Sequence, residues 1–403
     1  MTEHNTFSTE EHNDITGLVL SGGGARAAYQ VGVLHQLAKW FEQENRREFD
    51  FPFKILCGTS AGAINAAALT CAGRNFYQST ERMLRVWENF SSDQVFRADS
   101  LGIIRTGARW LSALSIGWML RKRPKCLLDN SPLSNLLHQL LHFRRLDEAL
   151  ENGTIHALAV TASSYSSGRS ITFFQTRKEI DTWVRTQRVA LPDRITVEHL
   201  LASAAIPFVF PSVQLNIEGK TEYFGDGSIR QLAPISPAIH LGANRVMVIG
   251  SSQSDKDHTA RTEMSNAYPS LAQIAGHAMA SIFLDSLSID IERLSRVNKT
   301  LSLLPPEVMS KTSLKPVELL VISPSERIDE IASRYTKDLP RPVRTLMSAL
   351  GATESSGSSL ASYLLFEANY TRELIRMGIA DTINKKDEVF EFFRLGQSVN
   401  KAI

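Results

Sequence analysis

The sequence predicts a three-layer α/β/α fold with a mainly parallel central sheet and a helical C-terminal extension. In residues 15–41, an apolar run is followed by three glycines and then by helical periodicity. The same order of apolar run, tight turn and helix recurs in residues 53–72, where the helix is rich in small residues. Two consecutive strand–turn–helix units are typical of a parallel sheet with helices packed against it.

The segments that follow continue this alternation. Helical stretches at 197–205 and 271–297 separate further apolar runs that we predict to be strands, at 155–162, 170–175, 245–250 and 317–322. Residues 90–125 interrupt the pattern, because they are rich in Arg, Trp and Ile and carry no clear strand signal. We interpret them as an inserted helical or loop element.

These patterns divide the chain into three parts. Residues 1–14 form a polar N-terminal arm, residues 15–300 form one large α/β domain that contains the insertion, and residues 301–403 form a C-terminal extension. The extension contains the last predicted strand and is otherwise mainly helical, with a Gly/Ser-rich stretch at 351–359 and an amphipathic helix at 364–377.

Composition narrows the classes of partner and location. The 403 residues include 44 Lys and Arg and 42 Asp and Glu, a net charge of +2, which gives no general attraction to nucleic acid. Residues 1–14 lack the basic segment and apolar core of a secretory signal, and no uncharged apolar run reaches the ~18 to 20 residues of a membrane-spanning helix. We therefore expect a cytoplasmic protein whose contact with a membrane is at most peripheral.

The three cysteines, Cys57, Cys71 and Cys126, show neither CxxC spacing nor the Cys/His spacing of a zinc site. Their odd number also argues against a disulfide framework. We expect buried or incidental thiols and no metal centre.

The pentapeptide Gly58-Thr59-Ser60-Ala61-Gly62 lies directly after a predicted strand and directly before a predicted helix. This is the context of a nucleophile elbow, in which a tight turn projects the serine side chain and small neighbours let strand and helix approach each other. The N-terminus of the helix also favours negative charge that develops at the serine. We therefore predict that Ser60 is a nucleophile.

A second set of groups follows the first predicted strand, where Gly22, Gly23, Gly24 and Ala25 supply unhindered backbone N–H groups. Glycines at this position let a substrate carbonyl approach, so the run can form an oxyanion hole. It can also be a simple connecting turn or a dinucleotide-binding loop. The dinucleotide-binding loop is disfavoured because the motif ends in Ala27 rather than glycine and because no acidic residue ends the second strand.

A nucleophilic serine needs a base, and the sequence offers no histidine in a context that marks a catalytic triad. Asp226 stands out instead, because it follows a short apolar segment and lies between Gly225 and Gly227, with Ser228 next. An aspartate between glycines is usually a turn residue. The residues alone therefore leave both interpretations of Asp226 open.

Together, these three segments resemble the patatin-like phospholipases, whose pattern is a glycine-rich loop, a Gly-x-Ser-x-Gly elbow and a distant Asp-Gly-Gly or Asp-Gly-Ala. The resemblance covers about residues 15–300 and includes LASAAIPFVFP at 201–211, which is similar to the Ala-Ser-x-Ala-x-Pro segment of the family. Ala27 stands where the loop of the family usually has glycine, and Ser228 stands where Gly or Ala is more common. Both replacements are small, and neither removes a backbone donor or the carboxylate.

The resemblance implies a patatin-like fold and hydrolysis of carboxylic esters of phospholipids or lysophospholipids, with no metal or organic cofactor. It implies a dyad in which Asp226 is the general base for Ser60, and an oxyanion hole made by the N–H groups of Gly23, Gly24 and Ala25. The alternative is a lipid-binding or regulatory protein that has the same fold and little or no turnover. Head group, ester position and chain length are not implied.

Three further assignments stay open at the level of sequence. Arg26 can steady the glycine loop, contact an anionic head group or simply lie on the surface of a helix. Residues 103–125 combine Trp, Ile and Leu with a basic end, which suits an anionic membrane surface and equally suits a helix packed on the core. The apolar faces predicted at 271–297 and 364–377 can belong to the core or to an interface between copies of the chain.

Overall fold

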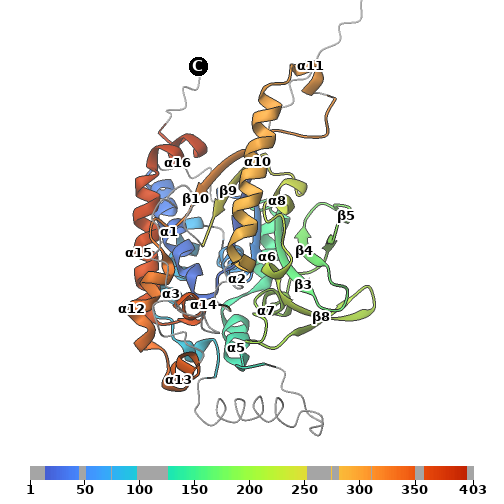
Figure 1. Ribbon diagram of the computed structural model, residues 1–403. Coiled ribbons are helices and arrows are strands. Elements are labelled where there is room, and N and C mark those ends of the chain that lie inside the picture. The colour runs from blue at the N-terminus through green and yellow to red at the C-terminus, as the bar shows by residue number, and fades with distance from the viewer. Residues whose placement is uncertain are drawn as a thin grey trace, which may run out of the picture.

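The computed structural model describes residues 14–44, 51–73, 75–97, 126–251, 274, 281–309, 311–349 and 358–396. Within these residues the chain folds around one 10-stranded sheet that carries helices on both faces (Figure 1). The predicted three-layer α/β/α fold is therefore confirmed. Most of the predicted insertion, at 98–125, and most of the Gly/Ser-rich stretch lie outside the described residues.

Five parallel strands form one half of the sheet, in the order β10-β9-β1-β2-β3. Beyond β3 the sheet is mixed, because β4 and β8 both pair antiparallel with β3. The strands are β1 (Thr16–Leu20), β2 (Ile55–Thr59), β3 (Ala157–Ser164), β4 (Ser170–Thr176), β5 (Trp183–Arg185), β6 (Arg188–Pro192), β7 (Val213–Ile217), β8 (Lys220–Asp226), β9 (Arg245–Ile249) and β10 (Glu318–Ile322).

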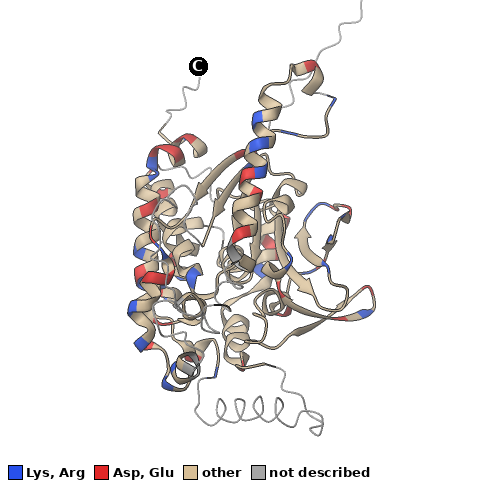
Figure 2. Cartoon of the chain, viewed as in Figure 1, with Lys and Arg blue, Asp and Glu red and all other residues tan. Residues whose placement is uncertain are grey.

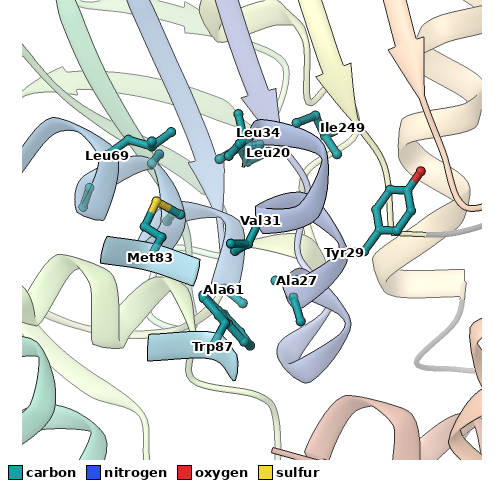
Figure 3. Packing of buried hydrophobic residues seen from close by; sticks show 14 of the residues in the cluster. Leu20, Ala27, Tyr29, Val31, Leu34, Ala61, Leu69, Met83, Trp87 and Ile249 are labelled. Carbon is teal, nitrogen blue, oxygen red and sulfur yellow. The ribbon is translucent and has the colours of Figure 1, made fainter. Parts of the chain in front are cut away.

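Alternate side chains of the central strands enter two different cores. Leu20 of β1 and Leu56 of β2 belong to the larger core, whereas Val19 and Ile55 belong to the smaller core on the opposite face. Strands that are buried on both faces need apolar residues at successive positions, which explains the uninterrupted apolar runs seen in the sequence. Figure 3 shows Leu20, Leu34 and Ile249 where β1, β9 and the first helix meet in the larger core.

The larger core lies under two groups of helices. The first group is α1 (Ala28–Gln43), α2 (Ala61–Cys71), α3 (Phe76–Glu88), α5 (Ser131–Leu140), α6 (Phe143–Glu151) and α7 (Val197–Ser203). The second group comes from the C-terminal part of the chain and is α12 (Ile328–Tyr335), α13 (Arg341–Ala349), α14 (Ser358–Leu364), α15 (Ala368–Asn384) and α16 (Lys386–Phe393).

The smaller core lies under α8 (Ser236–His240) and α10 (Ser286–Ser302), and α10 leads to the short α11 (Pro306–Met309). Charged side chains are frequent on α10, α15 and α16, whereas the central strands carry few of them (Figure 2). Among the helices of the described ranges, none combines the length and the hydropathy that are needed to cross a bilayer.

Helix α15, from the C-terminal part of the chain, packs directly against α1. A Cβ atom on Gly32 would lie 2.1 Å from the carbonyl oxygen of Ile375, and one on Gly378 would lie 2.3 Å from the carbonyl oxygen of Tyr29. The Tyr29 hydroxyl donates a hydrogen bond of 3.0 Å to Asp381 across the same contact. Glycines on both helices therefore permit an approach that any larger residue would prevent.

The boundaries of two predicted helices differ from those in the structure. The helix predicted at 364–377 begins at Ala368 and continues to Asn384, because residues 365–367 form a connection outside any helix. Within this connection Leu365 and Phe366 are buried, so their apolar character reflects core packing rather than helical periodicity. In the described part of the stretch predicted at 271–297, the regular helix α10 begins only at Ser286.

Candidate active site

Ser60 occupies the turn between β2 and α2. Its backbone has φ 55° and ψ −130°, a strained conformation for a residue with a side chain. A Cβ atom on Gly58 would lie 2.4 Å from the Cα of Ala63, and one on Gly62 would lie 2.3 Å from the carbonyl oxygen of Leu20. The two glycines of the pentapeptide are thus required by the close contact of strand and helix, as a nucleophile elbow demands.

Ser203 holds the elbow from the opposite side. The Ser60 N–H donates to the Ser203 hydroxyl over 2.8 Å, and that hydroxyl donates to the carbonyl oxygen of Thr161 on β3 over 2.6 Å. Ser203 is fully buried at the end of α7. No physical signal in the sequence singles out this residue, although it lies in the 201–211 segment that resembles the family.

Asp226 lies beside the elbow because of the pairing of three strands. Strand β2 runs parallel to β3 as far as the pair Thr59 and Thr161, and the next residue of β3, Ala162, pairs with Asp226 at the end of β8. Strands β2 and β8 therefore occupy the same edge of β3, one after the other. A Cβ atom on Gly227 would lie 2.0 Å from the carbonyl oxygen of Thr161, so this close pairing requires glycine after the aspartate.

The Asp226 carboxyl group is fully buried and only half satisfied. Its Oδ1 accepts a hydrogen bond of 2.9 Å from the Ser228 N–H, whereas Oδ2 has no hydrogen-bond partner among the described residues. Burial raises the pKa of Asp226 to about 6, and interactions with the Ser60 hydroxyl and with Ser228 limit the rise. The carboxylate is therefore ionised at neutral pH, yet it is more basic than a carboxylate in water.

The glycine loop follows β1 and leads into the short helix η1 (Gly24–Ala27). The Gly22 carbonyl oxygen accepts a hydrogen bond of 2.6 Å from Ser251, which fixes the start of the loop. In the described part of the chain, the N–H groups of Gly23, Gly24 and Ala25 have no acceptor. Gly24 and Ser60 line the same cavity, so donors without acceptors lie near the nucleophile.

Arg26 is buried under helix α14, which belongs to the C-terminal part of the chain. Its Nε donates to the Ser362 hydroxyl over 2.8 Å, and its guanidinium lies 4.3 Å from the centre of the Tyr363 ring and 3.7 Å from the Asp329 carboxylate. Its side chain is 2% exposed, so contact with a lipid head group is not feasible. Its burial also excludes a place on the surface of a helix, and we propose that Arg26 steadies the glycine loop.

Replacing Arg26 with alanine should lower the free energy of unfolding by about 3 kcal/mol, because the change removes a buried cation from its partners and leaves a cavity. Urea denaturation would measure the loss. The control is Arg327→Ala, which removes a half-exposed partner of the same Asp329 and should cost less than about 1 kcal/mol. Equal losses in the two variants would show that burial of Arg26 contributes nothing to stability.

A cavity of about 330 Å³ opens from Ser60 and follows one face of α2. Helix α2 contributes Ala61, Ile64, Asn65, Ala68 and the following Ala72, and further apolar walls come from α3 and α5. At the helical rise of ~1.5 Å per residue, Ala72 lies roughly 18 Å from Ser60. The cavity is thus an elongated apolar channel with the candidate nucleophile at one end.

The chain matches the family model for patatin-like phospholipase over residues 18–239. Because this match covers more than half of the sequence, the chain belongs to the patatin-like phospholipase family. At the level of the family it is a lipid hydrolase. No curated protein matches the sequence.

Solved structures with a similar arrangement share little sequence with this chain. VipD from Legionella pneumophila is 14% identical with a TM-score of 0.31, and the match covers 90% of this chain and 67% of VipD. Human GIVD cytosolic phospholipase A2, in complex with methyl gamma-linolenyl fluorophosphonate and terbium chloride, is 12% identical with a TM-score of 0.43 over 94% of this chain. The match covers 59% of the human enzyme.

Proposed function

We propose that this protein is a serine acyl hydrolase that cleaves carboxylic esters of phospholipids or lysophospholipids through Ser60 and Asp226. The observation that carries the proposal is the convergence of two features at one end of an apolar channel. A serine sits at a strained strand–helix turn, and a buried carboxylate lies at the end of β8, which pairs with the same edge of β3 as the serine's own strand β2. A nucleophile, a base and an apolar binding site are the parts that acyl-ester hydrolysis needs.

In the acylation step, the Asp226 carboxylate takes the hydroxyl proton while Ser60 Oγ attacks the ester carbonyl carbon. The carbonyl oxygen becomes an oxyanion, which we expect the N–H groups of Gly23, Gly24 and Ala25 to stabilise. Collapse of this intermediate breaks the bond to the alcohol oxygen, and Asp226 returns the proton to the departing alcohol. Ser60 is left as an acyl ester.

In the second step, Asp226 takes a proton from water, and the hydroxide that forms attacks the acyl carbonyl at Ser60. The same N–H groups donate hydrogen bonds to the second oxyanion, Ser60 Oγ leaves with the proton from Asp226, and the fatty acid is released. A pKa near 6 suits this role, since a base whose pKa lies near the working pH is both ionised and able to hold a proton.

The channel along α2 supports a long-chain acyl group as the part of the substrate that is bound. The hydrocarbon core of a bilayer is ~30 Å thick and holds two acyl chains end to end, so one chain spans roughly 15 Å. This length is close to the roughly 18 Å between Ser60 and Ala72. Methionine, leucine and tryptophan side chains such as Met83, Leu137 and Trp87 line the channel and provide an apolar surface for the hydrocarbon.

Contact between the protein and a membrane that supplies such a substrate remains a prediction. Peripheral contact with an anionic surface from a cytoplasmic location is consistent with a lipid substrate, but the segment expected to make that contact, at 103–125, lies outside the described residues. An interface between copies of the chain likewise stays a prediction.

The purified protein should hydrolyse a soluble fluorogenic ester and should release fatty acid from mixed phospholipid and lysophospholipid vesicles, with the products identified by mass spectrometry. Release of one fatty acid and the matching lysophospholipid from a diacyl lipid would fit the proposal. Binding to vesicles without cleavage of any ester would instead favour the lipid-binding alternative.

A further inference from the structure

Three arginines line the channel, and two of them, Arg82 and Arg145, lie at the end that is remote from Ser60. Arg82 and Arg85 lie on α3 and Arg145 lies on α6, and all three side chains are exposed while also lining the channel. None of them forms an ion pair with an acidic residue in the described ranges, although many surface arginines of this protein do so. An apolar channel therefore ends in a cluster of unpaired positive charge.

Two of these arginines are held in place by the end of α2. Arg82 Nη1 donates to the carbonyl oxygen of Ala72, and Arg145 Nη1 donates to the same oxygen over 3.2 Å and to that of Cys71 over 3.4 Å. A guanidinium has five N–H donors, so most donors of both residues have no acceptor among the described residues. The carbonyl oxygens orient the two guanidinium groups without neutralising their charge.

The head group of a bound substrate cannot reach this cluster. In a phospholipid the acyl ester and the phosphate are joined through a short glycerol segment, so an ester at Ser60 keeps the phosphate near Ser60. Ala72, whose carbonyl oxygen Arg82 and Arg145 contact, lies roughly 18 Å from Ser60, at the end of the acyl chain. A ligand that meets both the channel and the arginines must carry its negative charge at one end of a long hydrocarbon chain.

We propose that the arginine cluster binds the carboxylate of a free long-chain fatty acid whose hydrocarbon tail occupies the channel and points toward Ser60. This inference rests on the proposed function, since ester hydrolysis releases such an acid. Arginine forms charge-assisted, often bidentate hydrogen bonds with carboxylates. In the opposite orientation the acid would place its charge beside the ionised Asp226, and the two like charges would repel each other.

A fatty acid bound in this way fills the acyl channel and excludes the next substrate. The cluster is therefore a site of product inhibition that is specific for the acid. An uncharged alcohol of the same chain length can fill the channel but gains nothing from the arginines.

A binding measurement can distinguish the affinity for the fatty acid from that for the alcohol, and it does not require turnover. Displacement of a fluorescent fatty acid by palmitate and by hexadecanol would be measured on the wild-type protein and on the double variant Arg82→Gln/Arg145→Gln, in which glutamine keeps a donor for the Ala72 carbonyl. Palmitate should bind about tenfold more weakly to the double variant, because two charge-assisted contacts are lost. Hexadecanol should bind equally to both proteins.

The control is Arg144→Gln, which removes a neighbouring exposed arginine that pairs with Glu148 and does not line the channel. This variant should bind palmitate as the wild type does. The inference is overturned if the double variant binds palmitate with wild-type affinity, or if hexadecanol loses as much affinity as palmitate. The double variant Arg82→Lys/Arg145→Lys keeps the charge and should recover part of the palmitate affinity.

A soluble short-chain ester assay on the same preparations distinguishes a failure of this inference from a failure of the proposed function. If palmitate binding depends on the arginines but the protein hydrolyses no ester, the fatty-acid-binding site is supported and the proposed hydrolase function is rejected. If the protein hydrolyses esters but palmitate binding is unchanged by the arginine substitutions, only the site at the end of the channel is rejected.

Discussion

The Ser60→Ala variant is expected to lose ester hydrolysis by about 10⁴-fold or more in kcat/KM while it keeps its fold. The reaction proposed above forms its covalent intermediate on Ser60 Oγ, and no other group can replace that atom. Alanine and serine pay a similar cost for the positive φ at this turn, so the temperature of unfolding should change little. Hydrolysis of a soluble ester and thermal unfolding together measure the two effects.

The matched control is Ser295→Ala, which removes an exposed hydroxyl that bonds to its own helix α10. It should retain wild-type activity. A fluorophosphonate probe should add its mass to the wild-type chain and to the control but not to Ser60→Ala. Wild-type rates in the purified Ser60→Ala protein, with the probe on another serine, would place the nucleophile elsewhere and reject the dyad.

The elbow could be predicted from sequence because its signals are local. The apolar strand, the Gly-x-Ser-x-Gly turn and the small-residue helix lie within twenty consecutive residues. Each glycine of the turn is required because a Cβ atom there would clash with the backbone of an adjoining element. The parallel strands were predictable for a related reason. They are buried on both faces, so they appear as continuous apolar runs.

The rest of the candidate site depends on contacts between distant segments. Asp226 reaches Ser60 only because β8 continues the edge of β3 where β2 ends, and the half-exposed antiparallel strands β7 and β8 carry no continuous apolar signal. The support of the elbow by Ser203 and the burial of Arg26 under Tyr363 depend on tertiary packing in the same way. Single residues of this kind have no periodicity or spacing by which a sequence could reveal them.

The Asp226→Asn variant should lose activity by about 10³-fold or more, because an amide cannot take the Ser60 proton. In the wild-type enzyme, the same chemistry predicts that kcat/KM falls as the pH drops through about 6, where Asp226 becomes protonated. Measurement of the hydrolysis rate of a soluble ester between about pH 4.5 and about pH 8.5 would reveal this fall in kcat/KM. A rate that stays constant through pH 6 would contradict the role of Asp226 as the base.

The same substitution should make the protein more stable above pH 6. In the folded chain burial raises the pKa of Asp226 to about 6, whereas in the unfolded chain the carboxyl group has its ordinary value near 4. The ionised group therefore destabilises the fold by about 3 kcal/mol at high pH, a cost that is absent below about pH 4 and grows between 4 and 6. Asparagine is neutral and can still accept the Ser228 hydrogen bond through its side-chain oxygen.

Urea denaturation at pH 8 and at pH 4 would test this prediction. Asp226→Asn should exceed the wild type at pH 8 by up to about 3 kcal/mol and should match it at pH 4. The exposed control Asp181→Asn should shift stability by less than about 0.5 kcal/mol at either pH. A wild type more stable than Asp226→Asn at pH 8 would mean that the buried carboxylate gains more from its surroundings than burial costs it. A gain in stability together with a loss of activity would mean that the fold tolerates a destabilising charge at this position for the sake of its chemistry.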